Sequence, residues 1–354
     1  MAKVTRRYAV MAPGLFATRS AKTAHGVIAY SDDPTVAVID PDHAGKRVRD
    51  VLPYLQSDAP IVATLDEALR YEPNALLIGV APPGGALPTT WRATIVQALA
   101  ARLELVSGLH QFLAADAEFA AAAAASGTTI WDVRATPPPR LFTGAGYDVD
   151  ARVVLTVGSD CAVGKMTASL ELTRAARERG LRARFVATGQ TGIAIAGSGT
   201  AIDRVISDFA SGATEELVLA NAPDADLLFV EGQGGINHTA FAPVTLALLY
   251  GSTADALVLV HLATRTHVED FGTPLLPLPE LVSTYEALCG TVKPAKVAGI
   301  ALNTFGLDDD AARAAIERAA SETGLPCDDV VRHGPQALYD AMAPAFANKR
   351  PPLR

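Results

Sequence analysis

Short apolar runs alternate with helix-length segments along most of the chain. In the first 136 residues, the apolar runs that predict strands are residues 8–14, 27–30, 36–40, 61–63, 75–80, 103–107 and 128–133. The segments that predict helices between them are residues 65–70, 91–102 and 114–125. Alternating strands and helices are typical of an α/β fold built on a parallel sheet.

A proline-rich break divides this pattern in two. The run Pro137-Pro138-Pro139 cannot continue a helix or a sheet, so we expect residues 137–150 to be a linker. Beyond it, the expected strands are residues 153–157, 183–188, 226–230, 256–261 and 296–302, and the expected helices are residues 167–179 and 199–209. The chain therefore divides into two α/β domains, residues 1–136 and residues 151–354.

Composition narrows the class of protein. Hydrophobic residues make up 49% of the 354 residues and charged residues 19%, which predicts a large folded interior. The net charge of −8 argues against a nucleic-acid-binding surface. The three cysteines, an odd number at wide spacing, argue against a zinc knuckle or a disulfide framework. No apolar run reaches the roughly 18–20 residues of a membrane span, and the first residues lack a secretory pattern. We expect a cytoplasmic homo-oligomer that binds a small-molecule substrate, without nucleic-acid or membrane partners.

The most distinctive segment follows the strand at 153–157. A glycine-bearing loop that turns directly into a helix points backbone N–H groups at one position, and Lys165 adds a full charge there. Met166 stands where such loops normally carry the hydroxyl that binds Mg²⁺, and Thr167 is turned away by a helical step of about 100°. We therefore predict phosphate binding and no metal ion, rather than metal-dependent ATP hydrolysis. The alternative is a structural turn with a solvated lysine. The predicted phosphate-binding residues are Gly158, Ser159, Asp160, Cys161, Ala162, Val163, Gly164, Lys165, Met166 and Thr167.

Two further strand exits in the second domain are glycine-rich. The segment 189–193 is expected to be a loop suited to substrate recognition, through Gln190, Thr191 and Gly192. The strand before Glu231 delivers that carboxylate to the edge of the sheet, where ligands of parallel sheets bind. Three roles stay open for Glu231: holding a cation, taking a proton from an amine, or fixing Lys165.

Other polar residues follow the expected strands. The glycines Gly234 and Gly235 let another group approach the backbone closely, and we predict that they contact substrate. His238 is a candidate base, with a structural role equally open. Arg265 suits a carboxylate, because its guanidinium binds two oxygens at once. Asn303 ends a strand where this class of fold often reads an adenine edge.

Two features of the first domain leave their roles open. Asp40 ends a strand and suits either a ribose hydroxyl or a turn. The loop 81–85, Ala-Pro-Pro-Gly-Gly, suits either a ligand or a rigid turn.

These motifs resemble known families. The spacing Gly158-x5-Gly164-Lys165, with the Glu-Gly-x-Gly-Gly run that begins at Glu231, is similar to dethiobiotin synthetase, a P-loop NTPase-like protein. The whole chain, with its proline-linked Rossmann-like first half, resembles a two-domain family that includes D-glutamate N-acetyltransferases.

The second resemblance implies an activity and a cofactor. It implies that acetyl-CoA donates an acetyl group to the amino group of an acidic amino acid, with D-glutamate as the expected acceptor. Coenzyme A carries a pyrophosphate, a 3′-phosphate and an adenine, so a nucleotide-binding loop would hold it without cutting it. Transfer needs a base, for which Glu231 and His238 are the candidates, and Lys165 or backbone N–H groups would stabilise the developing oxyanion. Gln190 and Arg265 would contact the substrate carboxylates.

Two other functions stay open. One is an ATP/Mg-dependent ligase or kinase of the dethiobiotin synthetase type, which Met166 disfavours and Glu231 permits. The other is a nucleotide-binding regulator without catalysis.

Overall fold

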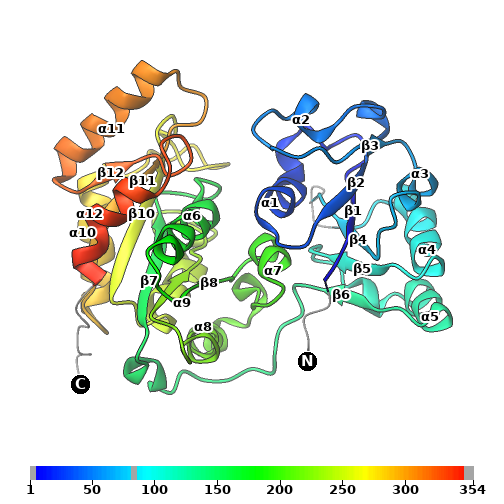
Figure 1. Ribbon diagram of the computed structural model, residues 1–354. Helices are drawn as coiled ribbons and strands as arrows, with labels where there is room; N and C mark the ends of the chain where they lie inside the picture. The colour runs from blue at the N-terminus through cyan, green and yellow to red at the C-terminus, as the bar shows by residue number, and fades with distance from the viewer. Residues whose placement is uncertain (1–4, 81–85, 347–354) are drawn as a thin grey trace. The chain divides into compact units, whose positions relative to one another are not determined.

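A computed structural model describes residues 5–80 and 86–346 of the chain (Figure 1). It forms two compact units. The first comprises Met1–Ala135 and Gln190–Ala201, and the second comprises Thr136–Gly189 and Ile202–Arg354. One boundary between the units lies near residue 136. The segment Gln190–Ala201 has its contacts in the first unit, although residues of the second flank it on both sides in sequence.

The first unit is built on a parallel sheet. Within the described residues it has six strands in the order β3-β2-β1-β4-β5-β6, which is the order of the Rossmann fold. The strands are β1 (Tyr8–Met11), β2 (Thr35–Ile39), β3 (Ile61–Val62), β4 (Ala75–Ile78), β5 (Glu104–Ser107) and β6 (Ile130–Asp132). The helices are α1 (Lys22–Tyr30), α2 (Val48–Val51), α3 (Leu65–Leu69), α4 (Arg92–Ala100), α5 (Ala117–Ser126) and α7 (Gln190–Ala196). In Figure 1, α1 and α7 lie on one side of this sheet and α3, α4 and α5 on the other.

One predicted strand of the first unit is wrong. Residues 27–30 form the last turn of α1 rather than a strand. Thr23, Ala24 and Val27 are buried, a spacing of one helical turn that places them on one face. A four-residue apolar run does not by itself distinguish a strand from a buried helix segment, which is why the prediction failed.

The second unit also contains a parallel sheet. Its described strands follow the order β12-β11-β10-β7-β9-β8. They are β7 (Arg152–Gly158), β8 (Ala183–Val186), β9 (Leu227–Val230), β10 (Ala256–Leu262), β11 (Lys296–Asn303) and β12 (Cys327–Asp328). The helices are α6 (Lys165–Glu178), α8 (Ser207–Asn221), α9 (Ala242–Gly251), α10 (Leu278–Gly290), α11 (Asp309–Thr323) and α12 (Gln336–Phe346).

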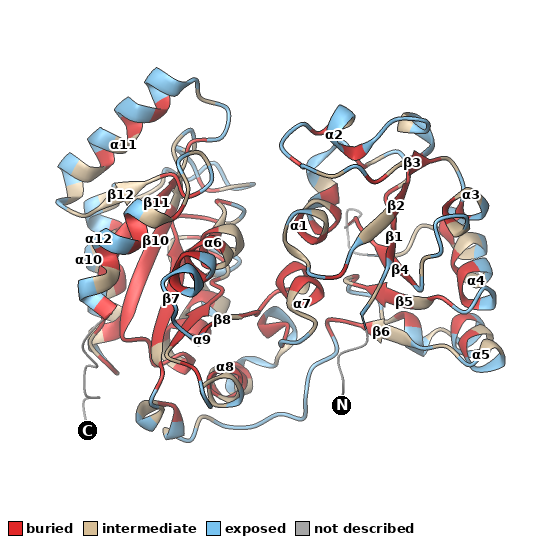
Figure 2. Ribbon diagram, viewed as in Figure 1, coloured by how far each residue is buried: buried red, intermediate tan, exposed pale blue. Residues whose placement is uncertain are grey.

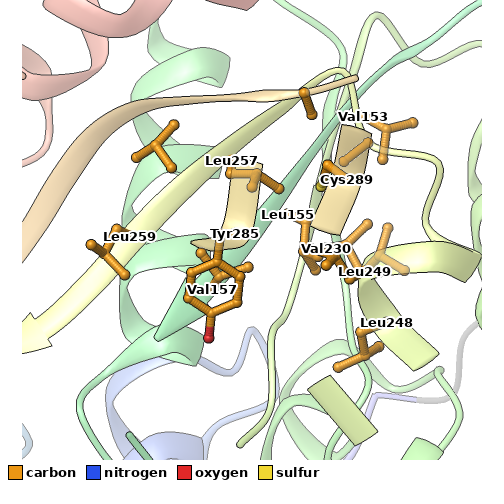
Figure 3. Close-up of a cluster of buried hydrophobic side chains, with 14 of the residues drawn as sticks. Val153, Leu155, Val157, Val230, Leu248, Leu249, Leu257, Leu259, Tyr285 and Cys289 are labelled. Atoms are coloured by element: carbon orange, nitrogen blue, oxygen red, sulfur yellow. The ribbon is translucent and has the colours of Figure 1, made fainter. Parts of the chain in front are cut away.

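Strand periodicity divides the core of the second unit into two layers. Along β7, Val153, Leu155 and Val157 belong to one buried cluster, with residues of α8, α9 and α10, and Val154 belongs to another, with residues of α6 and α12. Figure 3 shows side chains of the first cluster, among them Val157 of β7 and Tyr285 of α10. Successive side chains of a strand point to opposite faces, so both faces of this sheet are covered. Figure 2 shows the consequence, with buried strands and helices that keep one exposed face.

Two further predictions in this part of the chain are wrong. The predicted loop 189–193 contains the start of helix α7. The predicted helix 199–209 is a 3-10 turn, η7 (Ile202–Arg204), followed by α8 only from Ser207. Ile206 has an extended backbone (φ −57°, ψ 133°), which interrupts the helix that the charge pattern suggested. Within the described residues, none of the helices has the length and apolar character needed to cross a membrane.

Candidate functional site

The loop between β7 and α6 has the backbone of an anion site. Gly164 precedes α6 with φ +112°, a conformation that L side chains rarely adopt, and Ala162 has φ +52°. Within the described chain, no side chain caps the N-terminus of α6. The positive end of the helix dipole and its first N–H groups therefore face the loop, as the sequence predicted. Figure 1 shows this passage from β7 into α6.

Lys165 lies inside the loop rather than in solvent. Its side chain is buried, and Nζ donates hydrogen bonds of 2.7 Å to the carbonyl oxygens of Asp160 and Gly234. A Cβ on Gly158 would lie 2.7 Å from that Nζ, so a larger residue there would displace the ammonium group from its present position. The lysine therefore brings its charge to the inner side of the loop, and the alternative of a solvated structural lysine does not fit.

The glycines after β9 pack against this loop. A Cβ on Gly232 would lie 1.8 Å from the Thr156 carbonyl oxygen, and one on Gly235 would lie 2.9 Å from the Asp160 Cα. Gly234 has φ +65°, and its carbonyl oxygen accepts the hydrogen bond from Lys165 Nζ. These contacts give the glycines a packing role, and substrate contact by Gly234 and Gly235 stays a prediction.

Glu231 joins two neighbouring strand exits. Its Oε2 accepts hydrogen bonds from the backbone N–H groups of Thr188 (2.9 Å) and Gly189 (3.0 Å). Thr188 Oγ1 in turn donates to the Glu231 carbonyl oxygen at 2.7 Å. The carboxylate thereby fixes the segment that follows β8 to the end of β9, a positioning role that the sequence did not indicate.

Asp160 is the most buried charged group of the loop. It is 0% exposed, and Oδ2 accepts hydrogen bonds of 2.7 Å from Arg265 Nη1 and from the backbone N–H of Glu269. Arg265 Nη2 also contacts Glu269 Oε1 at 3.3 Å. The guanidinium expected to bind a substrate carboxylate is thus paired with carboxylates of the protein, and its substrate role stays a prediction. Asp160 Oδ1 has no hydrogen-bond partner among the described residues.

His238 lies beside that free oxygen. Its Nε2 is 4.0 Å from Asp160 Oδ1, and the side chain is 1% exposed. Nδ1 accepts a hydrogen bond from the backbone N–H of Ala240 at 3.2 Å. The rings of Phe241 and Phe271 pack against the imidazole, with centroid distances of 4.6 and 5.2 Å. Because Nδ1 faces a donor, a neutral His238 carries its proton on Nε2, toward Asp160.

Ser159 has a histidine partner that the sequence analysis did not single out. Ser159 Oγ lies 2.8 Å from Nδ1 of His261, near the end of β10. Burial, with a smaller effect of the Arg265 charge, lowers the pKa of His261 to about 4. The only signal in the sequence was the position of His261 at a strand end beside a polar loop.

A cavity of about 430 Å³ adjoins the start of α6. Its lining includes Thr167 of α6, Asn303 of β11, Phe305, Val331 and Arg332. Asn303 Nδ2 donates to the Val163 carbonyl oxygen (3.1 Å), and its Oδ1 accepts from the Phe305 N–H (3.0 Å). The amide therefore positions the loop backbone, and its contact with an adenine stays a prediction. The half-buried Met166 follows Lys165 at the start of α6, and Thr167 is directed to the cavity wall.

The remaining predicted site residues belong to the first unit. Gln190, Thr191 and Gly192 form the first turn of α7, and Thr191 Oγ1 lies 2.9 Å from Thr23 Oγ1 in a buried contact with α1. The structure thus groups the predicted residues into two sets, one in each unit, and the substrate contacts of this set stay a prediction.

Of the two roles predicted for Asp40 in the first unit, the contacts match the one in a turn. Asp40 is fully buried and accepts the Gly14 N–H at 2.6 Å, and it pairs with His43 Nδ1 at 2.6 Å. The loop 81–85 lies outside the described residues.

Comparison with known proteins agrees with this two-part architecture. Residues 41–136 match the DUF1611_N Rossmann-like domain, and residues 140–339 match the DUF1611_C P-loop domain, each described as a domain of unknown function. The crystal structure of a DUF1611 family protein from Anabaena variabilis ATCC 29413 is 42% identical, with a TM-score of 0.91 over 96% of this chain and 99% of that one.

Two relatives carry a functional name. A protein of Tritonibacter scottomollicae named D-glutamate N-acetyltransferase is 38% identical over 309 residues, covering 86% of this chain and 91% of the relative. A protein of Pseudoalteromonas sp. with the same name is 38% identical over 279 residues, covering 77% and 82%. The fold, the phosphate-type loop and these relatives together identify the chain as a member of the DUF1611 family, with a Rossmann-like N-terminal domain and a P-loop C-terminal domain.

Proposed function

We propose that the protein is an N-acetyltransferase that moves the acetyl group of acetyl-CoA to the amino group of D-glutamate. The observation that carries this proposal is the 38% identity to relatives of that name over 86% of the chain. The site supports the same reading, because a phosphate-type loop lies next to a cavity large enough for part of an organic cofactor.

The chemistry of coenzyme A matches the second unit. Its phosphates suit the N-terminus of α6 and the ammonium group of Lys165, since both concentrate positive charge at one position. Its adenine suits the cavity beside Phe305 and Arg332, where an aromatic ring and a guanidinium plane offer stacking surfaces. A carrier held at these two places needs no metal ion, which is consistent with Met166 at the position of the usual hydroxyl.

Acetyl transfer also needs groups that move protons and stabilise charge. The amino group of a free amino acid is mostly protonated at neutral pH, so it must lose a proton before it attacks. We keep Glu231 and His238 as proposed catalytic groups, with Lys165 as a proposed donor to the oxyanion. The Nε2–H of His238 suits a hydrogen bond to the developing oxyanion, because in the neutral ring this nitrogen is the donor.

We also propose that the protein works in the cytoplasm as a homo-oligomer. None of the three cysteines, all in the described part of the chain, forms a disulfide, as is usual in proteins of a reducing compartment. Size-exclusion chromatography with light scattering tests the oligomeric state.

The direct test follows free thiol after acetyl-CoA and D-glutamate are mixed with the protein. We expect thiol release that depends on D-glutamate and is slower with L-glutamate. Lys165→Met should raise the KM for acetyl-CoA by about tenfold or more, which corresponds to about 1.4 kcal/mol of lost binding. Lys296→Met is the matched control, because Lys296 is exposed at the first residue of β11, away from the strand exits.

The two alternative functions predict different results in the same assay. ADP formation from ATP and Mg²⁺, without thiol release, would indicate a ligase or kinase. Nucleotide binding with neither reaction would indicate a regulator. Either result contradicts the proposal.

A further inference from the structure

A thiol, an imidazole and a carboxylate converge at the exit of β7. Cys161 Sγ, one carboxylate oxygen of Asp160 and one ring nitrogen of His238 all lie within 4.8 Å of one another. The thiol is half-buried, and the other two side chains are almost fully buried. In the sequence, Cys161 is distinguished only as part of the predicted phosphate-binding loop.

The carboxylate in this cluster has one unused oxygen. Asp160 Oδ2 is fixed by Arg265 and by the Glu269 N–H, and Oδ1 has no hydrogen-bond partner in the described part of the protein. Burying a carboxylate oxygen without a hydrogen-bond partner is unfavourable, so such atoms usually serve a reaction or a ligand. Oδ1 is therefore placed to accept a proton from a neighbouring group.

The orientation of His238 distinguishes between two uses of the cluster. Asp, Cys and His together are also ligands of Zn²⁺. A metal ion would bind Nε2 and normally requires Nδ1 to donate its proton to an acceptor. Here Nδ1 faces the N–H of Ala240, so Nε2 carries the proton and the cluster favours proton transfer over metal binding.

We propose that Cys161 is the first acceptor of the acetyl group, so that an acetyl-cysteine forms before the amino acid reacts; this inference rests on the proposed acetyltransferase function. Cys161 lies in the loop assigned to the phosphates of the same cofactor, so the flexible pantetheine arm has to fold back to bring the thioester to this thiol. The exchange itself needs little free energy, because a thioester is present both before and after it. The two phenylalanine rings around His238, Phe241 and Phe271, provide an apolar environment for the acetyl methyl group.

The reaction has two balanced halves. In the first, the Cys161 thiol gives its proton to Asp160 Oδ1, and the sulfur forms a bond to the acetyl carbon while the bond from that carbon to the coenzyme A sulfur breaks. Coenzyme A leaves as a thiol after taking the proton from Asp160, and His238 Nε2–H donates to the oxyanion between these steps. In the second half, the neutral amine forms a bond to the acetyl carbon, the bond to Cys161 breaks, and the amine proton returns to the cysteine thiolate through Asp160.

The test uses the full-length protein and acetyl-CoA with a radiolabelled acetyl group, without D-glutamate. We expect one acetyl group per chain after acid quenching, located on Cys161 by peptide mass mapping and removed by neutral hydroxylamine as a thioester is. Adding D-glutamate to the isolated acetyl-protein should release labelled N-acetylglutamate at a rate no slower than kcat. Initial velocities with both substrates should give parallel double-reciprocal lines.

Variants separate the thiol from the rest of the fold. Cys161→Ala should lose the label and lower kcat by about 100-fold or more, because the first acceptor is gone. Cys327→Ala is the matched control. It should keep the acetyl label and an unchanged kcat, because Cys327 lies in β12, outside the cluster. Circular dichroism and binding of coenzyme A show whether the Cys161→Ala protein is folded.

Several results would overturn the inference while leaving the proposed function intact. These are turnover of D-glutamate with no acetyl group on Cys161, intersecting double-reciprocal lines, or a Cys161→Ala protein with near-normal kcat. One equivalent of zinc in the purified protein would also overturn it, in favour of a metal site. Absence of any turnover with D-glutamate would instead reject the function on which the inference rests.

Discussion

At the scale of single residues, the phosphate-type loop is held in place by the protein's own groups. Lys165 is fixed by two carbonyl oxygens, Asp160 by Arg265 and a backbone N–H, and Ser159 by His261. A loop with internal partners loses less conformational freedom when a ligand binds than an unsupported one does. These hydrogen bonds therefore fix the shape of the loop backbone.

His261 gives this network a dependence on pH. Its pKa is lowered to about 4 in the folded protein, so between about pH 6.5 and pH 4 the unfolded chain binds a proton that the folded chain does not. The contribution of His261 to the free energy of unfolding is therefore fully present above about pH 6.5. It is lost progressively as the pH decreases toward 4. From His261 we expect a loss of roughly 2 kcal/mol between about pH 7 and pH 5.

Urea unfolding at the two pH values checks this, with His261→Asn as the comparison. Asparagine keeps a polar group near Ser159 but does not titrate, so the variant should lose less stability on acidification than the unchanged protein. Equal losses in both proteins would mean that His261 does not carry the pH dependence.

At the scale of elements, the site depends on how closely the segment after β9 approaches β7. Gly232 N–H donates to Thr156 Oγ1 at 2.9 Å, and a Cβ on this glycine would meet the Thr156 carbonyl oxygen at 1.8 Å. No rearrangement of a flexible side chain relieves a clash with backbone. The two strand exits share one site because glycine is present here.

We expect Gly232→Ala to destabilise the protein by more than about 3 kcal/mol or to prevent soluble expression, since two backbones would have to separate. Gly290→Ala is the matched control, because Gly290 ends α10 with nothing within 4 Å of an added Cβ. The control should change the free energy of unfolding by less than about 1 kcal/mol. Thermal and urea unfolding measure both, and a stable Gly232→Ala protein would contradict the role of this contact.

At the scale of the whole molecule, the two compact units are not two consecutive pieces of sequence. Gln190–Ala201 is bounded on both sides by residues of the second unit but has its contacts in the first, where α7 packs on α1. The chain therefore passes between the units near residue 136 and twice more around α7. This arrangement predicts that the units stay associated when the link near residue 136 is cut.

A specific protease site placed after Thr136, in the exposed stretch 135–140, tests this. After cleavage, residues 1–136 and 137–354 should elute together in native size-exclusion chromatography, because α7 remains packed on α1. Adding Thr191→Arg should separate them, since Thr191 is 7% exposed and lies against Thr23. Fragments that separate without this substitution would show that α7 does not bind the first unit strongly.

Local patterns along the chain are enough to predict most elements and the chemistry that depends on contiguous residues. Strand periodicity predicted the α/β class and most strands of both sheets. The order Gly-x5-Gly-Lys predicted the phosphate-type loop, because a strand, a loop and a helix that follow one another along the chain are positioned by local geometry. The resemblance to the acetyltransferase family rested on such contiguous motifs, and the two relatives support it.

Contacts between residues distant in sequence depend on how the elements pack in the folded protein. This packing makes α7 a helix of the first unit, pairs Arg265 with Asp160 and Ser159 with His261, and places His238 beside Cys161. A glycine-rich segment such as 189–193 reads as a loop because glycine disfavours helix, and packing on α1 outweighs that local preference. Contacts of this kind depend on which strand exits become neighbours in the sheet, and hydrophobic periodicity along the chain carries no information about that order.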